Sequence, residues 1–226
     1  MEQTRLTRRG SLIGFGGFVF GLLGWKASGA DAGPSAVESG AISCVLAPEQ
    51  TEGPYYIDDE KLRRNITEGR PGEPLFLRLR VVDASTCRPI KGAAVDIWHA
   101  DALGVYSGFG SGSGNRTFMR GIQKTDATGL ARFRSVWPGW YQGRTVHIHV
   151  MAHVGGNVVH TGQLFFQDTL TDAVYRNAPY TSRPTRDVRN AADSIYRNGG
   201  KRSQVKVTKN SAGVYVASIV MGVHRS

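Results

Sequence analysis

The sequence contains few cysteines: two among 226 residues, Cys44 and Cys87. Neither belongs to a C-x-x-C pair or to a nucleophile motif, which excludes a C-x-x-C redox site and gives no reason to assign these residues catalytic chemistry. An oxidising compartment would favour one disulfide between them, and two buried free thiols are the alternative. A chain of this length can bury a core that is large enough to fold without many cross-links.

The sequence also lacks a hydrophobic run long enough to cross a membrane. Its apolar stretch at residues 12–25 is shorter than the roughly 18 residues that a spanning helix requires. The stretch follows Arg8-Arg9 and precedes small residues at 27–32, which is the pattern of a twin-arginine export signal. We therefore expect residues 1–32 to be a signal segment that sends the protein to the periplasm or the cell exterior, with an uncleaved membrane anchor as the alternative.

A long block of like charge is absent as well. The formal net charge is +10, and residues 31–226 still carry 24 basic against 17 acidic residues. The basic residues of segment 176–209 are scattered, which is typical of a solvated face and not of a nucleic-acid site. Nucleic acid is therefore not an expected partner. Weak electrostatic attraction to anionic aromatic acids or anionic surfaces is expected instead.

Helical periodicity is sparse, and short alternating segments dominate instead. Turn residues such as Pro138-Gly139 separate these segments, so the pattern predicts an all-β, antiparallel β-sandwich with little helix. We expect a flexible leader at 33–47, one domain at 48–226, and one or two helical turns near 172–175 and 189–197. The alternating segments are 75–82, 94–98, 131–136, 145–151, 163–166 and 214–223.

Two histidines stand one residue apart in the segment GRTVHIHVMAH, residues 143–153. On a strand, His147 and His149 share one face while Ile148 points to the other, so the pair could bind a single metal ion. Two imidazoles that hydrogen-bond within a core are the alternative. Tyr106 and Tyr141 occupy expected strand ends nearby, and phenolate oxygen together with imidazole suits iron(III) better than zinc.

Three segments give the chain a specific resemblance. DIWHADALGVYSG at 96–108, TDATGLARFRSVWPGWY at 125–141 and RTVHIHV at 144–150 resemble the intradiol ring-cleavage dioxygenases, the family of protocatechuate 3,4-dioxygenase and catechol 1,2-dioxygenase. The resemblance extends from about Pro48 to the C terminus, and its motifs occur in the same order along the chain as in the family. It implies a β-sandwich and a non-haem iron(III) cofactor held by four ligands, which in this chain are Tyr106, Tyr141, His147 and His149.

The same resemblance implies roles for further residues. Arg144 and Gln163 match an arginine and a glutamine beside the substrate, and Tyr141 matches the ligand that leaves the metal to act as a base. The segment PEQTEGPYY at 48–56 resembles a wall of the pocket, which makes Pro54 and Tyr55 candidate substrate contacts. As alternatives, Arg144 forms a surface ion pair, Gln163 is a strand-edge residue and Tyr55 packs in the core. Trp98 matches an aromatic residue that supports the site wall.

Other positions depart from the family pattern. Only five residues separate Tyr141 from His147, fewer than is usual, and Thr145 replaces the proline that normally follows the arginine. A shorter loop should leave the pocket more open, which affects substrate choice more than chemistry. The long helical dimerisation segment of the catechol enzymes has no counterpart, so their assembly is not assumed and a homo-oligomer remains open. The four histidines outside the pattern are expected to be structural or exposed: His99, His153, His160 and His224.

The resemblance implies an exported enzyme that uses iron(III) and O2 to cleave catechol-type diols between the two hydroxyl-bearing carbons, giving muconate-type diacids. Its partners would be a small aromatic diol and O2, with membrane contact only through an uncleaved export segment. Two alternatives remain at this stage: a metal-free β-sandwich that binds carbohydrate or protein, and a zinc or copper enzyme on the same fold. The sequence does not identify the preferred catechol.

Overall fold

The structure, a computed structural model, describes residues 44, 46–58, 61–109 and 113–225. Every described residue belongs to one compact unit. The expected signal segment at 1–32 and most of the expected leader at 33–47 lie outside the described residues. None of the described helices has the length and apolar character needed to span a membrane.

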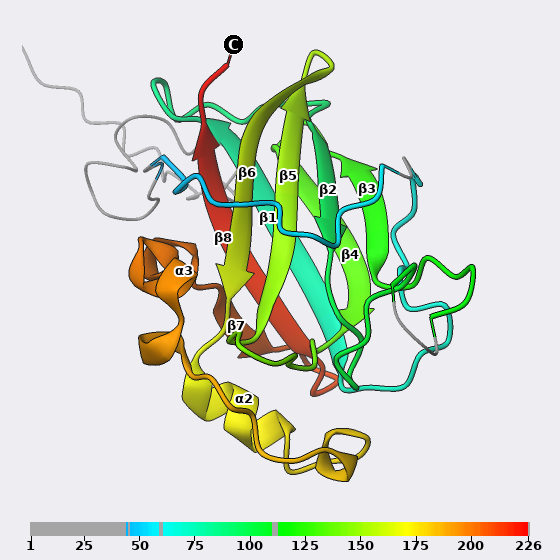
Figure 1. The fold of residues 1–226 in the computed structure, drawn as a ribbon. Coiled ribbons are helices and arrows are strands. Elements are labelled where there is room, and N and C mark those ends of the chain that lie inside the picture. The colour runs from blue at the N-terminus through cyan, green and yellow to red at the C-terminus, as the bar shows by residue number, and fades with distance from the viewer. Residues whose placement is uncertain (1–43, 45, 59–60, 110–112, 226) are drawn as a thin grey trace, which may run out of the picture. The chain divides into compact units, whose positions relative to one another are not determined.

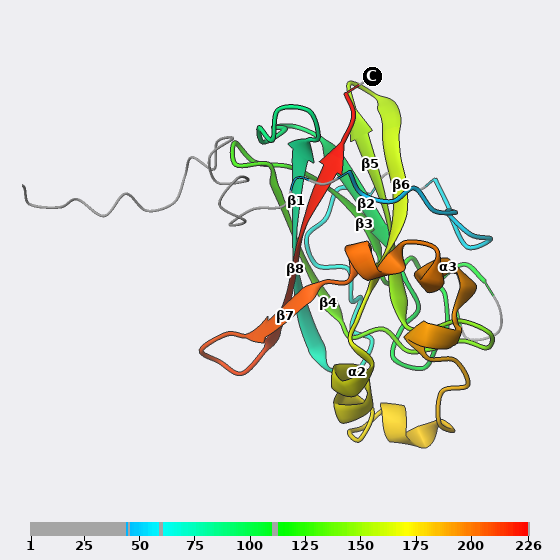
Figure 2. The same ribbon diagram turned by 90° about the vertical axis from the view of Figure 1, so that its left-hand side faces the viewer.

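Within that described part, strands form two four-stranded sheets that face each other (Figures 1 and 2). The first sheet has the strand order β4-β1-β8-β7, and the second has the order β3-β2-β5-β6. The predicted all-β sandwich is confirmed. The strands are β1 (Pro74–Asp83), β2 (Ala94–Trp98), β3 (Arg120–Lys124), β4 (Leu130–Val136), β5 (His147–Val154), β6 (Asn157–Phe165), β7 (Lys206–Lys209) and β8 (Tyr215–Val223).

The core lies between the sheets because each sheet turns one set of alternate side chains inward. On β1, Leu75, Leu77 and Leu79 are fully buried. On β5, Ile148 and Val150 belong to the same hydrophobic cluster. Burying each such side chain stabilises the fold by roughly 1.5–3 kcal/mol. The intervening residues of β5 are consequently directed to the outer face of the second sheet.

Strand pairing departs from a purely antiparallel sandwich at one position. β1 and β8 pair in parallel, from Leu75 with Tyr215 to Asp83 with Val223, while the other named pairs are antiparallel. A parallel pair requires a long connection, and here most of the domain lies between the two strands. The expected strand at 163–166 overlaps the end of the longer β6, and neither β3 nor β7 has a counterpart among the expected strands.

Helix is sparse in the described part, as expected. The α-helices are α2 (Asp168–Val174) and α3 (Ser194–Arg197), and three short 3-10 helices are η1 (Tyr180–Ser182), η2 (Asn190–Ala192) and η3 (Gly200–Ser203). The two expected helical regions, 172–175 and 189–197, therefore correspond to α2 and to η2 with α3.

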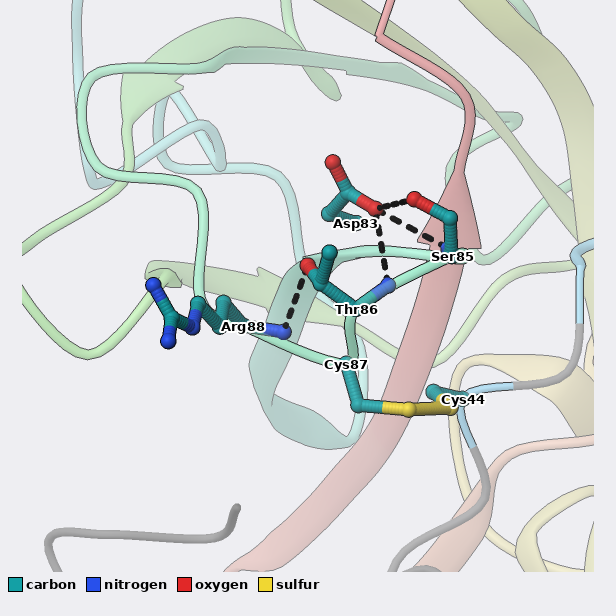
Figure 3. Close-up of a disulfide and its surroundings, with 6 residues drawn as sticks. All are labelled: Cys44, Asp83, Ser85, Thr86, Cys87 and Arg88. Atoms are coloured by element: carbon teal, nitrogen blue, oxygen red, sulfur yellow. Dashed lines mark hydrogen bonds between the residues drawn. A yellow bond between two sulfur atoms is a disulfide. The ribbon is translucent and has the colours of Figure 1, made fainter. Parts of the chain in front are cut away.

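Cys44 and Cys87 form a disulfide (Figure 3). Cys87 lies in the turn after β1, where Asp83 Oδ1 accepts hydrogen bonds from the backbone N–H groups of Ser85 at 2.9 Å and Thr86 at 3.0 Å. The predicted disulfide is confirmed, and the free-thiol alternative is wrong. The bond ties the chain ahead of Leu46 to the end of β1.

Residues 46–58, here called the crossing segment, run from the first sheet to the second. The Ala47 N–H donates to the Gly222 carbonyl on β8 at 2.9 Å, and the Gln50 N–H donates to the Thr161 carbonyl on β6 at 2.9 Å. Figure 1 shows this blue segment passing in front of β6, β5 and β2. It therefore covers the outer face of the second sheet, where the odd-numbered residues of β5 are found.

Candidate metal centre

His147 and His149 lie on the covered outer face of β5. Both side chains are buried, at 3% and 1% exposure. Their Nε2 atoms are 3.1 Å apart. Two imidazole nitrogens bound to one metal ion at about 2.1 Å each would lie about 3 to 3.4 Å apart, so this separation fits a shared ion. The prediction that the two histidines share one face is confirmed.

Hydrogen bonding prepares His147 as a ligand. Its Nδ1 lies 2.7 Å from the Thr145 carbonyl oxygen, which can only accept. Nδ1 therefore carries the proton and Nε2 presents a lone pair toward His149. Burial lowers the pKa of His147 to about 3 and lowers the pKa of His149 well below its usual value. Both rings are neutral near pH 7, as metal binding requires.

Tyr141 completes one side of this cluster. Its hydroxyl oxygen lies 3.3 Å from His147 Nε2, and its ring packs edge-on against Tyr106 with the centroids 5.6 Å apart. The side chain is half-buried. Burial raises the pKa of the Tyr141 phenol, although Arg144 opposes that shift. Tyr141 is thus protonated unless further positive charge is present.

Tyr106 lies deeper than Tyr141. Its ring centroid is 6.3 Å from that of His149, and its buried hydroxyl makes no hydrogen bond of normal geometry within the described residues. Burial raises the pKa of Tyr106 well above its usual value. An unpaired buried hydroxyl is costly, and a bound cation would both satisfy the oxygen and favour its phenolate form.

The donor set fits a hard trivalent metal. The described residues contain no group of three or more His, Cys, Asp and Glu side chains suited to a metal, which are the side chains that zinc sites generally use. The cluster instead offers two imidazole nitrogens and two phenol oxygens, and this combination suits iron(III). Tyr106, Tyr141, His147 and His149 are therefore brought together as the sequence predicted, while their role as ligands stays a prediction.

The tyrosines lie on two loops that contact each other through their backbones. Tyr106 follows β2, and Tyr141 lies between β4 and β5. Gly139 N–H donates to the Asp101 carbonyl at 2.9 Å. Gly104 has φ +79°, and a Cβ there would lie 2.2 Å from the Trp140 carbonyl oxygen. A side chain at Gly104 would therefore separate the two loops that carry the phenols.

The crossing segment forms an aromatic wall beside the phenols. Tyr55 stacks on Tyr106 with ring centroids 4.4 Å apart, and it meets Tyr141 edge-on at 5.6 Å. Pro54 is exposed, and its role as a substrate contact stays a prediction. Trp98 stacks on His149 at 5.0 Å, consistent with its expected role as support for the site wall.

Arg144 joins the candidate site to a buried polar network. Its Nη1 donates to the Tyr141 hydroxyl at 3.5 Å, and its Nη2 donates to Gln163 Oε1 at 2.6 Å. Gln163 is fully buried and donates through Nε2 to the Thr51 carbonyl at 3.1 Å. Arg144 thus contacts the Tyr141 phenol, and Gln163 contacts Arg144. Their expected roles beside a substrate stay predictions.

Asp193 is a member of this network that the sequence analysis missed. Its fully buried carboxylate accepts from Arg144 Nε at 2.7 Å and from the Thr145 N–H at 3.0 Å. Burial would raise the pKa of Asp193, but hydrogen bonds from Arg144 and from backbone N–H groups lower it. Asp193 also caps α3 by accepting from the N–H groups of Ile195 and Tyr196. A capping aspartate is visible in the sequence, but its contact with Arg144, 49 positions earlier, is not.

Other histidines have different partners. His99 is fully buried, with Nδ1 2.8 Å from the Ala100 carbonyl oxygen and Nε2 2.7 Å from Ser135 Oγ. His160 Nδ1 lies 2.8 Å from Glu49 Oε1, and His224 is exposed. These three residues are structural or exposed, as expected.

Comparison with known families gives one match over this region. A family model described as "Dioxygenase" matches residues 51–171, a range that contains the four candidate ligands, Arg144 and Gln163 but not Asp193. Catechol 1,2-dioxygenase 2 of Acinetobacter lwoffii is 34% identical over 123 residues, which are 47% of this chain and 44% of that protein. Chlorocatechol 1,2-dioxygenase of Burkholderia cepacia is 27% identical over 146 residues, 54% of this chain and 56% of that protein. The chain thus spans about half the length of these curated relatives.

Solved structures match over a larger share of the chain. An intradiol ring-cleavage dioxygenase from Tetranychus urticae superposes with a TM-score of 0.76 at 36% identity, covering 80% of this chain and 95% of that one. The dioxygenase domain of a dioxygenase carbohydrate-binding protein fusion from Streptomyces sp. SirexAA-E gives a TM-score of 0.61 at 29% identity, covering 80% and 99%. The similarity therefore extends over four fifths of this chain and nearly all of each of those structures.

Proposed function

Because the chain belongs to the intradiol ring-cleavage dioxygenase family, we propose that it is a non-haem iron(III) enzyme that cleaves catechol-type diols between the two hydroxyl-bearing carbons, using O2 and yielding muconate-type diacids. The convergence of two histidines and two tyrosines carries this proposal, above all the 3.1 Å separation of the His147 and His149 Nε2 atoms. Family membership favours an enzyme over the metal-free binding module that the sequence left open.

Four side chains would hold the metal: Tyr106, Tyr141, His147 and His149. A bound iron(III) ion would act as a Lewis acid toward both diol oxygens and would draw electron density from the ring so that it can react with O2. The aromatic wall at Tyr55 would receive the diol ring beside the phenols. The crossing segment would also exclude water from this face of β5.

The two tyrosines differ in their freedom to move, which supports a division of labour. Tyr106 is buried beneath Tyr55, whereas Tyr141 is half-buried. Tyr141 can therefore swing away from the histidines when a diol enters, and its phenolate oxygen can then take a proton from one diol hydroxyl. Tyr106 would stay in place and hold the metal as a phenolate.

Arg144 would stabilise negative charge that develops on the ring carbon. Its guanidinium is always charged, and two fixed acceptors, Asp193 and Gln163, hold its Nε and Nη2. The remaining nitrogen, Nη1, faces the Tyr141 hydroxyl. A preorganised cation of this kind needs no rearrangement during the reaction, so it favours the transition state over the bound diol.

Asp193→Asn is expected to lower kcat by about 100-fold, because a misplacement of about 1 Å in a charged catalytic group has roughly this cost. Asparagine can still cap α3 with its carbonyl oxygen, but its amide group would repel the Arg144 guanidinium. Iron content and the visible spectrum of the resting enzyme should remain those of the wild type, because no proposed ligand is changed. Steady-state kinetics with a catechol would measure the effect.

A matched control for this substitution is Asp126→Asn, which removes the carboxylate of the Arg132 ion pair on the first sheet. It should leave kcat within about twofold. A kcat for Asp193→Asn equal to that of the wild type would remove Asp193 from the positioning of Arg144.

The substrate can be identified with a panel of catechol, hydroxyquinol, protocatechuate and methylcatechols. Oxygen uptake and ring-opened product would be measured for the iron-loaded chain, with the zinc-loaded chain as the matched control. We expect iron-dependent turnover of at least one diol. Equal activity of the zinc-loaded chain, or turnover of none of the diols, would contradict the proposed function.

We also propose export by the twin-arginine route. The support is the Arg8-Arg9 pair ahead of an apolar stretch, in residues that lie outside the described part of the chain. Replacing both arginines by lysine should block export while the protein accumulates inside the cell, because this route reads the arginine pair. Fractionation followed by immunoblotting measures it, and undiminished export of the Lys-Lys form would point to another route.

A further inference from the structure

His147 and His149 differ in how their imidazole rings are held in place. His147 Nδ1 lies 2.7 Å from the Thr145 carbonyl oxygen, whereas His149 Nδ1 is buried and has no hydrogen-bond partner among the described residues. A histidine that binds a metal through one ring nitrogen usually donates the N–H of the other nitrogen to an acceptor, which fixes the ring. Because His149 lacks this bond, its orientation has to come from packing.

One packing contact of His149 is with Trp98. Trp98 on β2 is in register with His149 on β5, so the two side chains extend from the same face of the second sheet. Their rings are stacked, with centroids 5.0 Å apart and planes 6° from parallel. Trp98 is itself buried, and the Tyr56 ring packs on it with centroids 4.8 Å apart. The indole therefore has little room to move away from His149.

A second packing contact is with Gly53 of the crossing segment. Gly53 has φ +73°, and a Cβ at this position would lie 3.0 Å from His149 Cε1 and 3.6 Å from Nε2. Non-bonded carbon atoms prefer a separation of about 3.5–4.0 Å. Glycine permits both this backbone conformation and this close approach. Only the absence of a side chain lets the crossing segment lie so near the His149 ring.

Hydrogen bonds tie the crossing segment to the strand next to His149. Gln163 on β6 is in register with His149, and its Nε2 donates to the Thr51 carbonyl at 3.1 Å. Thr51 Oγ1 in turn accepts from the Gly53 N–H at 3.1 Å. Figure 1 shows the crossing segment passing in front of β5. The turn that contains Gly53 is thus fixed beside the imidazole.

We propose that Gly53 and Trp98 are positioning residues for His149, and that their packing replaces the missing hydrogen bond to Nδ1. This inference rests on the proposed function, in which His149 Nε2 binds iron. The two contacts keep that atom 3.1 Å from the Nε2 atom of His147, the separation that a shared ion requires. The crossing segment therefore supports the metal centre as well as covering it.

Gly53→Ala in the full-length chain tests this role. The added methyl group would press on His149 Cε1, and Trp98 leaves the ring little room to yield, so Nε2 should shift relative to His147. Iron(III) affinity, measured by competition with nitrilotriacetate, should fall by about tenfold or more, since loss of outer-shell support typically weakens metal binding by about 10- to 100-fold. The electron paramagnetic resonance signal of the resting iron(III) should also change in rhombicity.

The matched control is Gly213→Ala, in the turn between β7 and β8. Gly213 has φ +77°, and a Cβ there would meet no atom within 4 Å, so the substitution strains the backbone without touching a histidine. Its iron affinity should stay within about twofold of the wild type. An equal loss in both variants, or a wild-type affinity and signal in Gly53→Ala, would overturn the inference alone. Absence of iron from the wild type would contradict the proposed function and this inference with it.

Trp98 is tested by a conservative and a non-conservative substitution. Trp98→Leu removes the stacked ring, and iron(III) affinity should fall by about fivefold or more, in line with the free energy of an aromatic pair. Trp98→Phe keeps a ring that can stack on His149, so most of the affinity should be recovered. Circular dichroism would establish that both variants retain the sandwich. Equal affinities of the two variants would exclude stacking on Trp98 as a support of His149.

Discussion

His147→Ala or His149→Ala is expected to weaken iron binding by more than about 100-fold. Each substitution removes one of four proposed protein ligands, and the loss of an outer-shell partner alone typically weakens metal binding by about 10- to 100-fold. The Nε2 atoms of the two rings are 3.1 Å apart, so neither can be replaced without leaving the other beside a gap. Iron per chain after reconstitution, measured by plasma mass spectrometry, gives the result.

His153→Ala is the matched control, because His153 belongs to the same strand, β5, but lies outside the proposed ligand set. It should bind as much iron as the wild type. Circular dichroism of all three variants would establish that the sandwich is retained. Wild-type iron content in His147→Ala or His149→Ala would exclude that residue as a ligand.

The two tyrosine substitutions are expected to have different effects. Tyr141→Phe removes the departing base, so binding of a catechol as its dianion should slow by about 100-fold or more, the usual contribution of a positioned base. The visible band of the resting enzyme should shift because a phenolate is lost. Tyr106→Phe keeps the base but removes the permanent phenolate, so it should change the colour of both the resting and the catechol-bound enzyme.

Visible spectra recorded before and after anaerobic addition of a catechol measure both effects. Tyr55→Phe is the matched control, because it removes a hydroxyl from the neighbouring ring while the stacking on Tyr106 is kept. Its resting band should equal that of the wild type. If Tyr141→Phe binds the dianion as fast as the wild type, Tyr141 is not the departing base.

The sandwich could be predicted from the sequence because its cause is local. Alternation such as that of Leu75, Leu77 and Leu79 leads to a strand with one buried face, and the structure has this strand. The parallel pairing of β1 with β8 could not be predicted, because it depends on contacts between segments more than 130 positions apart. The short β7 was not predicted either, because its residues are largely exposed and therefore show no apolar alternation.

Parts of the candidate site could also be predicted from the sequence, and other parts could not. The one-residue spacing of His147 and His149 determines that they share a face, and the family resemblance supplied the two tyrosines. Asp193 was missed because its buried contact with Arg144 arises only when the segment before α3 packs beside β5. The crossing segment that covers the histidines is likewise a tertiary feature, held to β6 through Gln50.

The central claim is that these residues direct ring cleavage between the two hydroxyl-bearing carbons. The most direct measurement is mass spectrometry of the product formed from a catechol by the iron-loaded enzyme under ¹⁸O₂. The account predicts a muconate-type diacid that contains both atoms of one O2 molecule. A semialdehyde from cleavage beside the hydroxyl-bearing carbons, or an oxidised but unopened ring, would contradict it.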